Sequence, residues 1–185
     1  MDQENNKSRL KQQIQSLRSN NRAAIMDTLK ELRSEGDVSV LPDLFTLLLI
    51  QEDKNILAET SALLNDLKEQ EAAEILADAI ADPAYQKIKT ILVAACWQNG
   101  LSYGKHIDTF VNVIVSGGYS AAIEAFTVIE EAVGELGDRE RQQLASSLKS
   151  KLRKVDDQLK PLFVELVRVI ESYQAPDTKH QALNA

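Results

Sequence analysis

Two neighbouring stretches decide the fold class: residues 37–48, DVSVLPDLFTLL, and residues 53–67, DKNILAETSALLNDL. In the second stretch the apolar residues recur every three or four positions, which places them along one face of a helix. In the first stretch, Pro42 falls in the first turn of the expected helix, where its missing N–H is tolerated. Asp53 stands where a helix-capping side chain is expected. The two stretches therefore predict two helices joined by a short turn.

The same pattern continues in both directions along the chain. Leu, Ala, Glu, Lys and Gln, which are good helix formers, dominate the composition, whereas Gly and Pro are scarce. Pairs such as Asp82-Pro83 and Asn99-Gly100 stand at the breaks between the apolar stretches. The spacing predicts nine helices, over about residues 20–35, 37–48, 53–67, 71–80, 83–99, 104–116, 119–134, 139–154 and 157–173.

One of these segments could also form a strand. Residues 110–115, FVNVIV, are rich in β-branched side chains, which favour extended backbone. A lone strand among helices would have no partner for its backbone hydrogen bonds. We therefore expect this segment to be helical as well.

The expected helices recur at a regular interval. Aligned hairpin openings at Arg22, Asn55, Gln86 and Ser120, with a fifth near Leu159, lie 33, 31, 34 and 39 residues apart. A period in the thirties with two helices per unit is typical of a helical solenoid, in which neighbouring units cover one another's apolar faces. The sequence thus predicts a row of stacked hairpins.

The stretch from Gly36 to Ile56 resembles a HEAT repeat. It has a proline near the start of one helix, an apolar run Leu44-Phe45-Thr46-Leu47-Leu48, and then Asp53 ahead of an aliphatic residue. The resemblance covers about residues 22–68, and over 86–116 and 119–154 it extends to spacing and apolar pattern only. The family's frequent Arg after the aliphatic residue is replaced by Leu57. The resemblance implies an all-α, right-handed α-α superhelix of the HEAT/ARM-like solenoid kind, with about nine helices plus an N-terminal capping helix.

Three segments are expected along the chain. Residues 1–19 are expected to form a polar capping helix with Leu10, Ile14 and Leu17 on one face. This apolar pattern is too short to support a coiled-coil arm. Residues 20–173 form the helical-repeat domain. Residues 174–185 are polar and are expected to form a flexible C-terminal tail.

Charge is distributed unevenly over the chain, whose net charge is −7. Residues 23–137 contain seven basic and nineteen acidic residues, whereas residues 138–154 contain six basic and two acidic ones. An acidic middle repels phosphate backbones, so nucleic acid is an unexpected partner. The basic segment 149–154 is interpreted as the solvated face of a helix.

The cellular location expected for the protein follows from the absence of targeting and membrane segments, and the state of its cysteine follows from its surroundings. The N-terminus is polar and lacks an apolar segment typical of a secretory signal. Apolar runs such as Leu47–Ile50 are far below the roughly 20 residues that span a membrane. The single cysteine, Cys96, lies in an apolar run and is expected to be a buried core residue. We expect a cytoplasmic protein without a membrane span.

Catalytic and cofactor motifs are not found in the sequence. His106 and His180 have no second histidine within a helical turn, and no dinucleotide, phosphate-loop or nucleophile-elbow motif is present. HEAT-type deoxyhypusine hydroxylases carry His-Glu pairs for iron, and this chain has no His-Glu dipeptide. We expect no bound metal or cofactor.

Six residues are candidates for partner binding. Glu124, Glu131 and Glu135 are expected on one helix face, opposite a core stripe through Ala122, Ile123, Phe126, Ile129 and Val133. Trp97 is expected either to pack between repeats or to stand exposed near Tyr103, and Tyr119 completes the set. Exposed Trp and Tyr side chains are frequent binding anchors.

The leading hypothesis is a non-enzymatic scaffold or adaptor that binds a protein or peptide, with a basic segment complementing the acidic middle. One alternative is a nucleic-acid-modifying enzyme that resembles the HEAT-type alkylpurine DNA glycosylases, with Trp97, Tyr103 and Asp108 in the roles of that family's Trp, Tyr and Asp. Another is a lyase-like protein that handles a tetrapyrrole or other cofactor. Monomer and homodimer both stay open.

Overall fold

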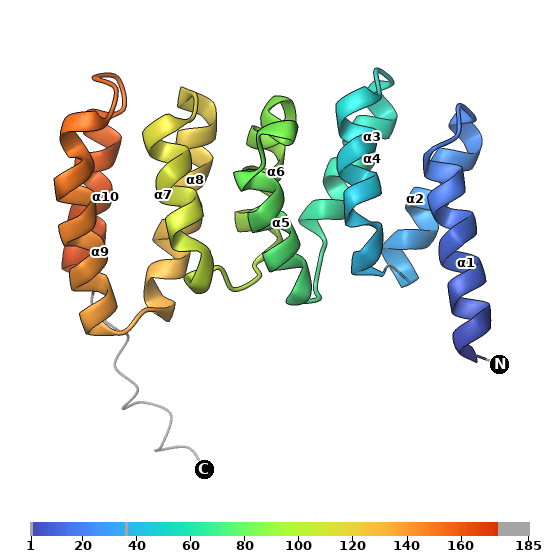
Figure 1. Ribbon diagram of the computed structural model, residues 1–185, viewed down its shortest axis with the longest axis horizontal. Coiled ribbons are helices and arrows are strands. Elements are labelled where there is room, and N and C mark those ends of the chain that lie inside the picture. The colour runs from blue at the N-terminus through green and yellow to red at the C-terminus, as the bar shows by residue number, and fades with distance from the viewer. Residues whose placement is uncertain (1, 36, 174–185) are drawn as a thin grey trace, which may run out of the picture.

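The structure is a computed structural model that describes residues 2–35 and 37–173. Within these residues it contains ten α-helices and no strand, which confirms the all-α class (Figure 1). The helices are α1 Asp2–Leu17, α2 Arg22–Glu35, α3 Leu41–Ile50, α4 Lys54–Asn65, α5 Glu71–Ala81, α6 Lys89–Asn99, α7 Ile107–Ser116, α8 Tyr119–Ala132, α9 Asp138–Lys151 and α10 Lys160–Ser172.

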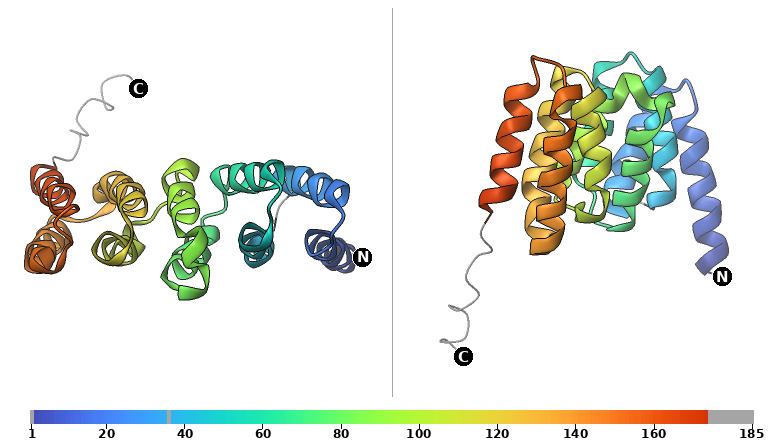
Figure 2. Two further views of the ribbon diagram at one scale, coloured as in Figure 1. Left: turned by 90° about the horizontal axis from the view of Figure 1, so that it is seen from above. Right: turned by 60° about the vertical axis from the view of Figure 1, so that its left-hand side comes forward.

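Each odd-numbered helix pairs with the helix that follows it, and the pairs stand side by side in a row (Figures 1 and 2). The even-numbered helices α2, α4, α6, α8 and α10 contact one another in sequence and form one layer. The odd-numbered helices form the other layer, with α1 against α3 and α5 against α7. The packing is compatible with a helical repeat.

The hairpin phase expected from the sequence is wrong. The aligned positions Arg22, Asn55, Gln86 and Ser120 mark the second helix of each pair or the turn before it, because α2, α4, α6 and α8 each pack more extensively against the helix before them than against the helix after them. The sequence interval between successive pairs is unaffected, because moving the starting point of every unit by the same amount does not change the distance between units.

Local sequence explains most helix boundaries. The Asp53 carboxylate accepts hydrogen bonds from the backbone N–H groups of Asn55 and Ile56 and caps α4, as predicted. The Asn21 side chain accepts from the N–H of Ala24 at 3.2 Å at the start of α2. Gly100 ends α6 with φ of 68°, a left-handed conformation that suits glycine. Gly36, which directly follows the helix expected over residues 20–35, lies outside the described residues.

Short 3₁₀ turns replace the ends of several predicted helices. Pro83–Ile88 form a 3₁₀ segment before α6, with non-helical dihedral angles at Tyr85. Other 3₁₀ turns occupy Val38–Val40, Gly104–His106, Val133–Glu135 and Leu152–Lys154. The β-branched segment 110–115 is helical, as predicted, because its apolar side chains pack against α8.

One continuous apolar core runs between the two layers, built largely from Leu, Ile, Val and Ala. Cys96 is 1% exposed, as expected for a core residue. At one end of the row α1 packs against α2 and α3 through Leu17 and the buried amide of Gln13. The division into cap, repeat domain and tail stays a prediction, and the expected tail, 174–185, lies outside the described residues.

Neighbouring hairpins are joined by side-chain hydrogen bonds at regular intervals. Asn65 Nδ2 donates to Gln98 Oε1 at 2.7 Å, across 33 residues of sequence. Gln70 donates to the carbonyl of Ser102 at 2.8 Å and accepts from its N–H at 2.9 Å, across 32 residues. The sequence interval therefore matches the spatial step from one pair to the next.

Candidate protein-binding surface

Trp97 lies in the seam between α6 and α8. Its ring is half-buried, and its indole Nε1–H donates to Glu124 Oε2 at 2.6 Å. Of the two placements expected for Trp97, the structure shows the one between neighbouring hairpins. Both Trp97 and Glu124 are therefore engaged with each other, and neither is a free anchor.

Tyr103 does not stand beside Trp97 on the surface, which corrects the expectation of an exposed aromatic pair. It is 2% exposed and packs edge-on against Phe110, with ring centroids 5.5 Å apart. Its hydroxyl accepts a hydrogen bond from Asn99 Nδ2 at 3.1 Å. Burial raises the pKa of the Tyr103 hydroxyl, with the nearby Cys96 thiol acting in the same direction. Tyr103 is a core residue.

Glu135 also has internal partners. Its Oε2 atom accepts from the N–H of Gly104 at 2.9 Å and from the hydroxyl of Ser102. A Cβ atom at position 104 would lie 2.6 Å from the same oxygen, so the glycine permits this close approach. Glu135 thus ties the α8–α9 connection to the α6–α7 connection.

Tyr119 and Glu131 are the two candidates that remain exposed on α8. Tyr119 is 58% exposed at the first position of the helix. The pKa of Glu131 is raised, chiefly because partial burial disfavours its charge and also because Glu130 is close. Ile123, expected in the core stripe, is 40% exposed instead, because α8 turns its alanines inward.

A wider acidic surface covers the middle of the row. Helices α5, α7 and α8 contain seven carboxylates and no lysine or arginine, and α6 contains a single basic residue, Lys89. On α5 the exposed acids Glu71, Glu74 and Asp78 follow one another at helical spacing. None of these seven carboxylates forms an ion pair within residues 2–35 and 37–173.

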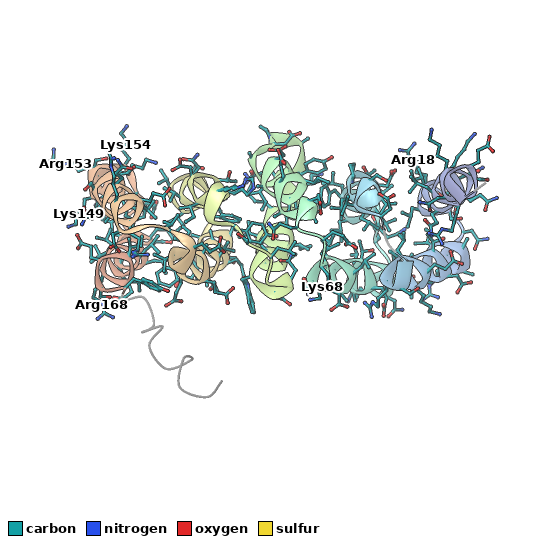
Figure 3. The ribbon with its side chains drawn as sticks, turned by 90° about the horizontal axis from the view of Figure 1, so that it is seen from below. Arg18, Lys68, Lys149, Arg153, Lys154 and Arg168 are labelled. Atoms are coloured by element: carbon teal, nitrogen blue, oxygen red, sulfur yellow. The ribbon has the colours of Figure 1, made fainter. Side chains whose placement is uncertain are left out.

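Basic side chains gather at one end of the row. Figure 3 shows Lys149, Arg153 and Lys154 together on the α9 side of the terminal pair. Lys149 forms an ion pair with Glu171 at 2.6 Å, and Arg168 forms one with Glu165. Cations in the last turn of α9 and just beyond it favourably oppose the helix dipole. Their position is accounted for by helix stability.

The three residues proposed as counterparts of the DNA glycosylase residues do not lie together in one site. Tyr103 is buried, Trp97 lies in the α6–α8 seam, and Asp108 is exposed on α7 in the other layer. Over the described part of the chain, no group of three or more His, Cys, Asp or Glu side chains could hold a metal ion. No helix there is both long and apolar enough to cross a bilayer.

Surface clefts open where hairpins meet. One, of about 350 Å³, lies between the ends of α2 and α4 and the start of α3. Its floor is aliphatic, with Leu63 and Leu67 on one side, and its rim carries both charges, including Arg33 and Asp66. Arg33 lies 3.5 Å from Asp66 and 3.6 Å from Glu59, so the rim is largely neutralised internally.

No protein-family model matches this chain, and no curated protein matches it. The assignment of function therefore depends on the geometry and charge described above.

Proposed function

We propose that this protein is a non-enzymatic scaffold or adaptor, built as a right-handed HEAT/ARM-like α-solenoid. It binds a basic segment of a partner protein or peptide. The solenoid assignment is supported by the row of helix pairs and by hydrogen bonds that recur across 32 and 33 residues. The resemblance of residues 22–68 to a HEAT repeat agrees with it.

One observation carries the binding proposal: α5, α7 and α8 expose six of their seven carboxylates with no cation of their own to offset them. Such a field attracts a positively charged partner, accelerates encounter and rejects acidic partners. The other sequence candidates are less suitable anchors, because Trp97, Glu124 and Glu135 are engaged internally.

A salt-dependent binding assay tests this proposal. The probe is a fluorescently labelled peptide rich in Lys and Arg, and a Glu-rich peptide of equal length and a DNA duplex serve as controls. We expect anisotropy to report binding of the basic peptide alone. Its affinity should be severalfold weaker at about 300 mM than at about 50 mM NaCl, because the distance over which charges interact shortens as ionic strength rises.

Charge-reversal variants test which carboxylates bind the basic peptide. Glu74→Lys and Glu131→Lys change exposed side chains without internal ion pairs, so the fold should tolerate both. Glu52→Lys, an exposed acid outside the central helices, is the matched control. Equal affinity for the basic and acidic peptides, or affinity unmoved by salt and by both reversals, would show that the electrostatic proposal is wrong.

A further inference from the structure

The outer face of α8 carries large apolar side chains, of which Tyr119 and Ile123 point away from the core. Tyr119, Ile123 and Phe126 follow one another at i, i+4 and i+7, so they share one side of the helix. Glu130 continues the same line at i+11. Tyr119 and Ile123 are 58% and 40% exposed, and Phe126 is half-buried. We call these four residues the α8 outer face.

The inner side of α8 has the opposite character. It is built mainly from small side chains, and its buried residues are Ala121, Ala122, Ala125, Val128, Ile129 and Ala132. Alanines let α8 approach α6 and α7 closely, which explains why the small residues point inward. Phe126 packs partly against the core, but the core does not explain why Tyr119 and Ile123 point the other way.

Another exposed apolar side chain lies on the neighbouring helix α10. Val164 is the fifth residue of α10 and is 53% exposed. It has the same position in its helix as Ile123, the fifth residue of α8, which is 40% exposed. Within the described residues, three of the four exposed large hydrophobic side chains therefore lie on α8 and α10, which are adjacent in one layer. The fourth, Ile50, lies on α3 in the other layer. Clustered exposed apolar groups are typical of interaction sites.

Two carboxylates stand at the far end of this face. Glu130 and Glu131 occupy the last turn of α8, where the negative end of the helix dipole disfavours an acid. Neither forms an ion pair within the described chain. A cation bound here would relieve both the dipole interaction and the repulsion between the two carboxylates.

We infer that the α8 outer face, with Val164 and Glu131 at its edges, is the docking site for a peptide segment that presents an aliphatic or aromatic side chain and a Lys or Arg about 10 Å apart. That separation follows because Glu130 lies seven positions after Ile123 on the helix, at a rise of about 1.5 Å per residue. The inference rests on the proposed function and assigns its site and the chemistry of its partner.

The basic residues at the α9–α10 end of a second copy offer this combination less well. The unpaired basic residues Arg153 and Lys154 have no exposed large hydrophobic side chain beside them in the described 139–154 region. Val164 and Arg168 do lie one turn apart on α10, but Arg168 already pairs with Glu165. A separate peptide supplies both groups without breaking an existing ion pair.

The test uses a displayed library of random 12-residue peptides, selected against the full chain. An enriched peptide is then synthesised with a fluorescent label, and its affinity is measured by anisotropy. Ile123→Asp disrupts the docking face, and Ile50→Asp makes the same change at the exposed isoleucine of the other layer. Circular dichroism and the thermal midpoint verify that both variants fold.

We expect enriched peptides to combine an apolar residue with Lys or Arg. Their affinity should fall about tenfold or more with Ile123→Asp, fall severalfold with Glu130→Lys, and be unchanged with Ile50→Asp. Basic peptides that bind Ile123→Asp normally but are lost on Glu71→Lys with Glu74→Lys would overturn the inference and leave the proposed function standing.

Two other outcomes also overturn it. Sedimentation showing a dimer that Ile123→Asp dissociates would assign the α8 outer face to a second copy. Failure to enrich any basic peptide, with the chain monomeric, would reject both the docking site and the proposed function.

Discussion

The indole N–H of Trp97 on α6 donates a hydrogen bond to the Glu124 carboxylate on α8 at 2.6 Å. This contact couples two neighbouring helix pairs across 27 residues of sequence. Because the pairs otherwise meet mainly through apolar side chains, the bond adds orientation to the α6–α8 interface. It also gives the seam an internal spectroscopic reporter, since Trp97 is the chain's single tryptophan.

Replacing Trp97 by Phe or Glu124 by Gln is expected to weaken this seam. Each single variant should lower the free energy of unfolding by about 1 kcal/mol, and the double variant by less than the sum. Urea unfolding of the four proteins gives the coupling energy. Additive losses would show that the two side chains do not interact in solution. Ile50→Ala, at an exposed site remote from the seam, controls for a general surface effect.

Gly104→Ala is expected to displace Glu135, because the new Cβ would meet Glu135 Oε2 at 2.6 Å. The carboxylate then loses its bonds to Gly104 and Ser102, and stability should fall by about 1 kcal/mol. In a Glu135→Ala background the same substitution should have almost no effect. Thermal unfolding of both backgrounds is the measurement, and an equal loss in each would contradict the role assigned to Glu135. Gly118→Ala, where a Cβ has open space, is the matched control.

Tyr103→Phe should destabilise the protein although it retains the ring. The substitution leaves the buried Asn99 amide without the hydroxyl that accepts its hydrogen bond, at a cost of about 1–2 kcal/mol. Denaturant unfolding measures this loss. Tyr119→Phe removes an exposed hydroxyl and should leave stability unchanged. Equal behaviour of the two variants would show that the buried hydrogen bond contributes nothing.

Cys96 should be unreactive in the folded protein, because burial raises the pKa of its thiol to about 12. A thiol reagent such as DTNB at pH 8 is expected to label it only as fast as the chain opens. The folded-state pKa lies above the unfolded one, so this group's contribution to stability is complete below about pH 9 and is lost as pH rises toward 12. Rapid native-state labelling would mean that Cys96 is accessible.

Glu131→Gln should slightly stabilise the protein near neutral pH, by roughly 0.3–0.5 kcal/mol at low salt, since it removes an acid from the last turn of α8. The pKa of Glu131 is raised on folding, so the native carboxyl takes up its proton more readily. The advantage of the variant should therefore shrink as pH falls through the ordinary carboxyl range. Unfolding at several pH values measures this, and a larger advantage in acid would contradict it.

The helical elements were predictable because their signals are local. Periodic apolar residues, the Asp53 cap and the Asn99-Gly100 stop act within one or two turns of backbone, and the structure places helices accordingly. The phase of the pairing was not predictable in the same way. Whether a helix packs first against its predecessor or its successor depends on turn geometry and on contacts between distant residues.

For the candidate binding surface too, some features follow from local sequence and others from tertiary packing. The sequence alone determined the helical class, the interval between helix pairs and the acidic character of residues 23–137, because composition and short-range periodicity contain all three. Only the tertiary structure decided that Tyr103 is buried, that Trp97, Glu124 and Glu135 bond within the molecule, and that Ile123 is exposed. A helix with apolar residues on two sides does not specify which side faces the core. On α8 that choice was made by close packing against α6 and α7, which accepts the four alanines and leaves Tyr119 and Ile123 outside.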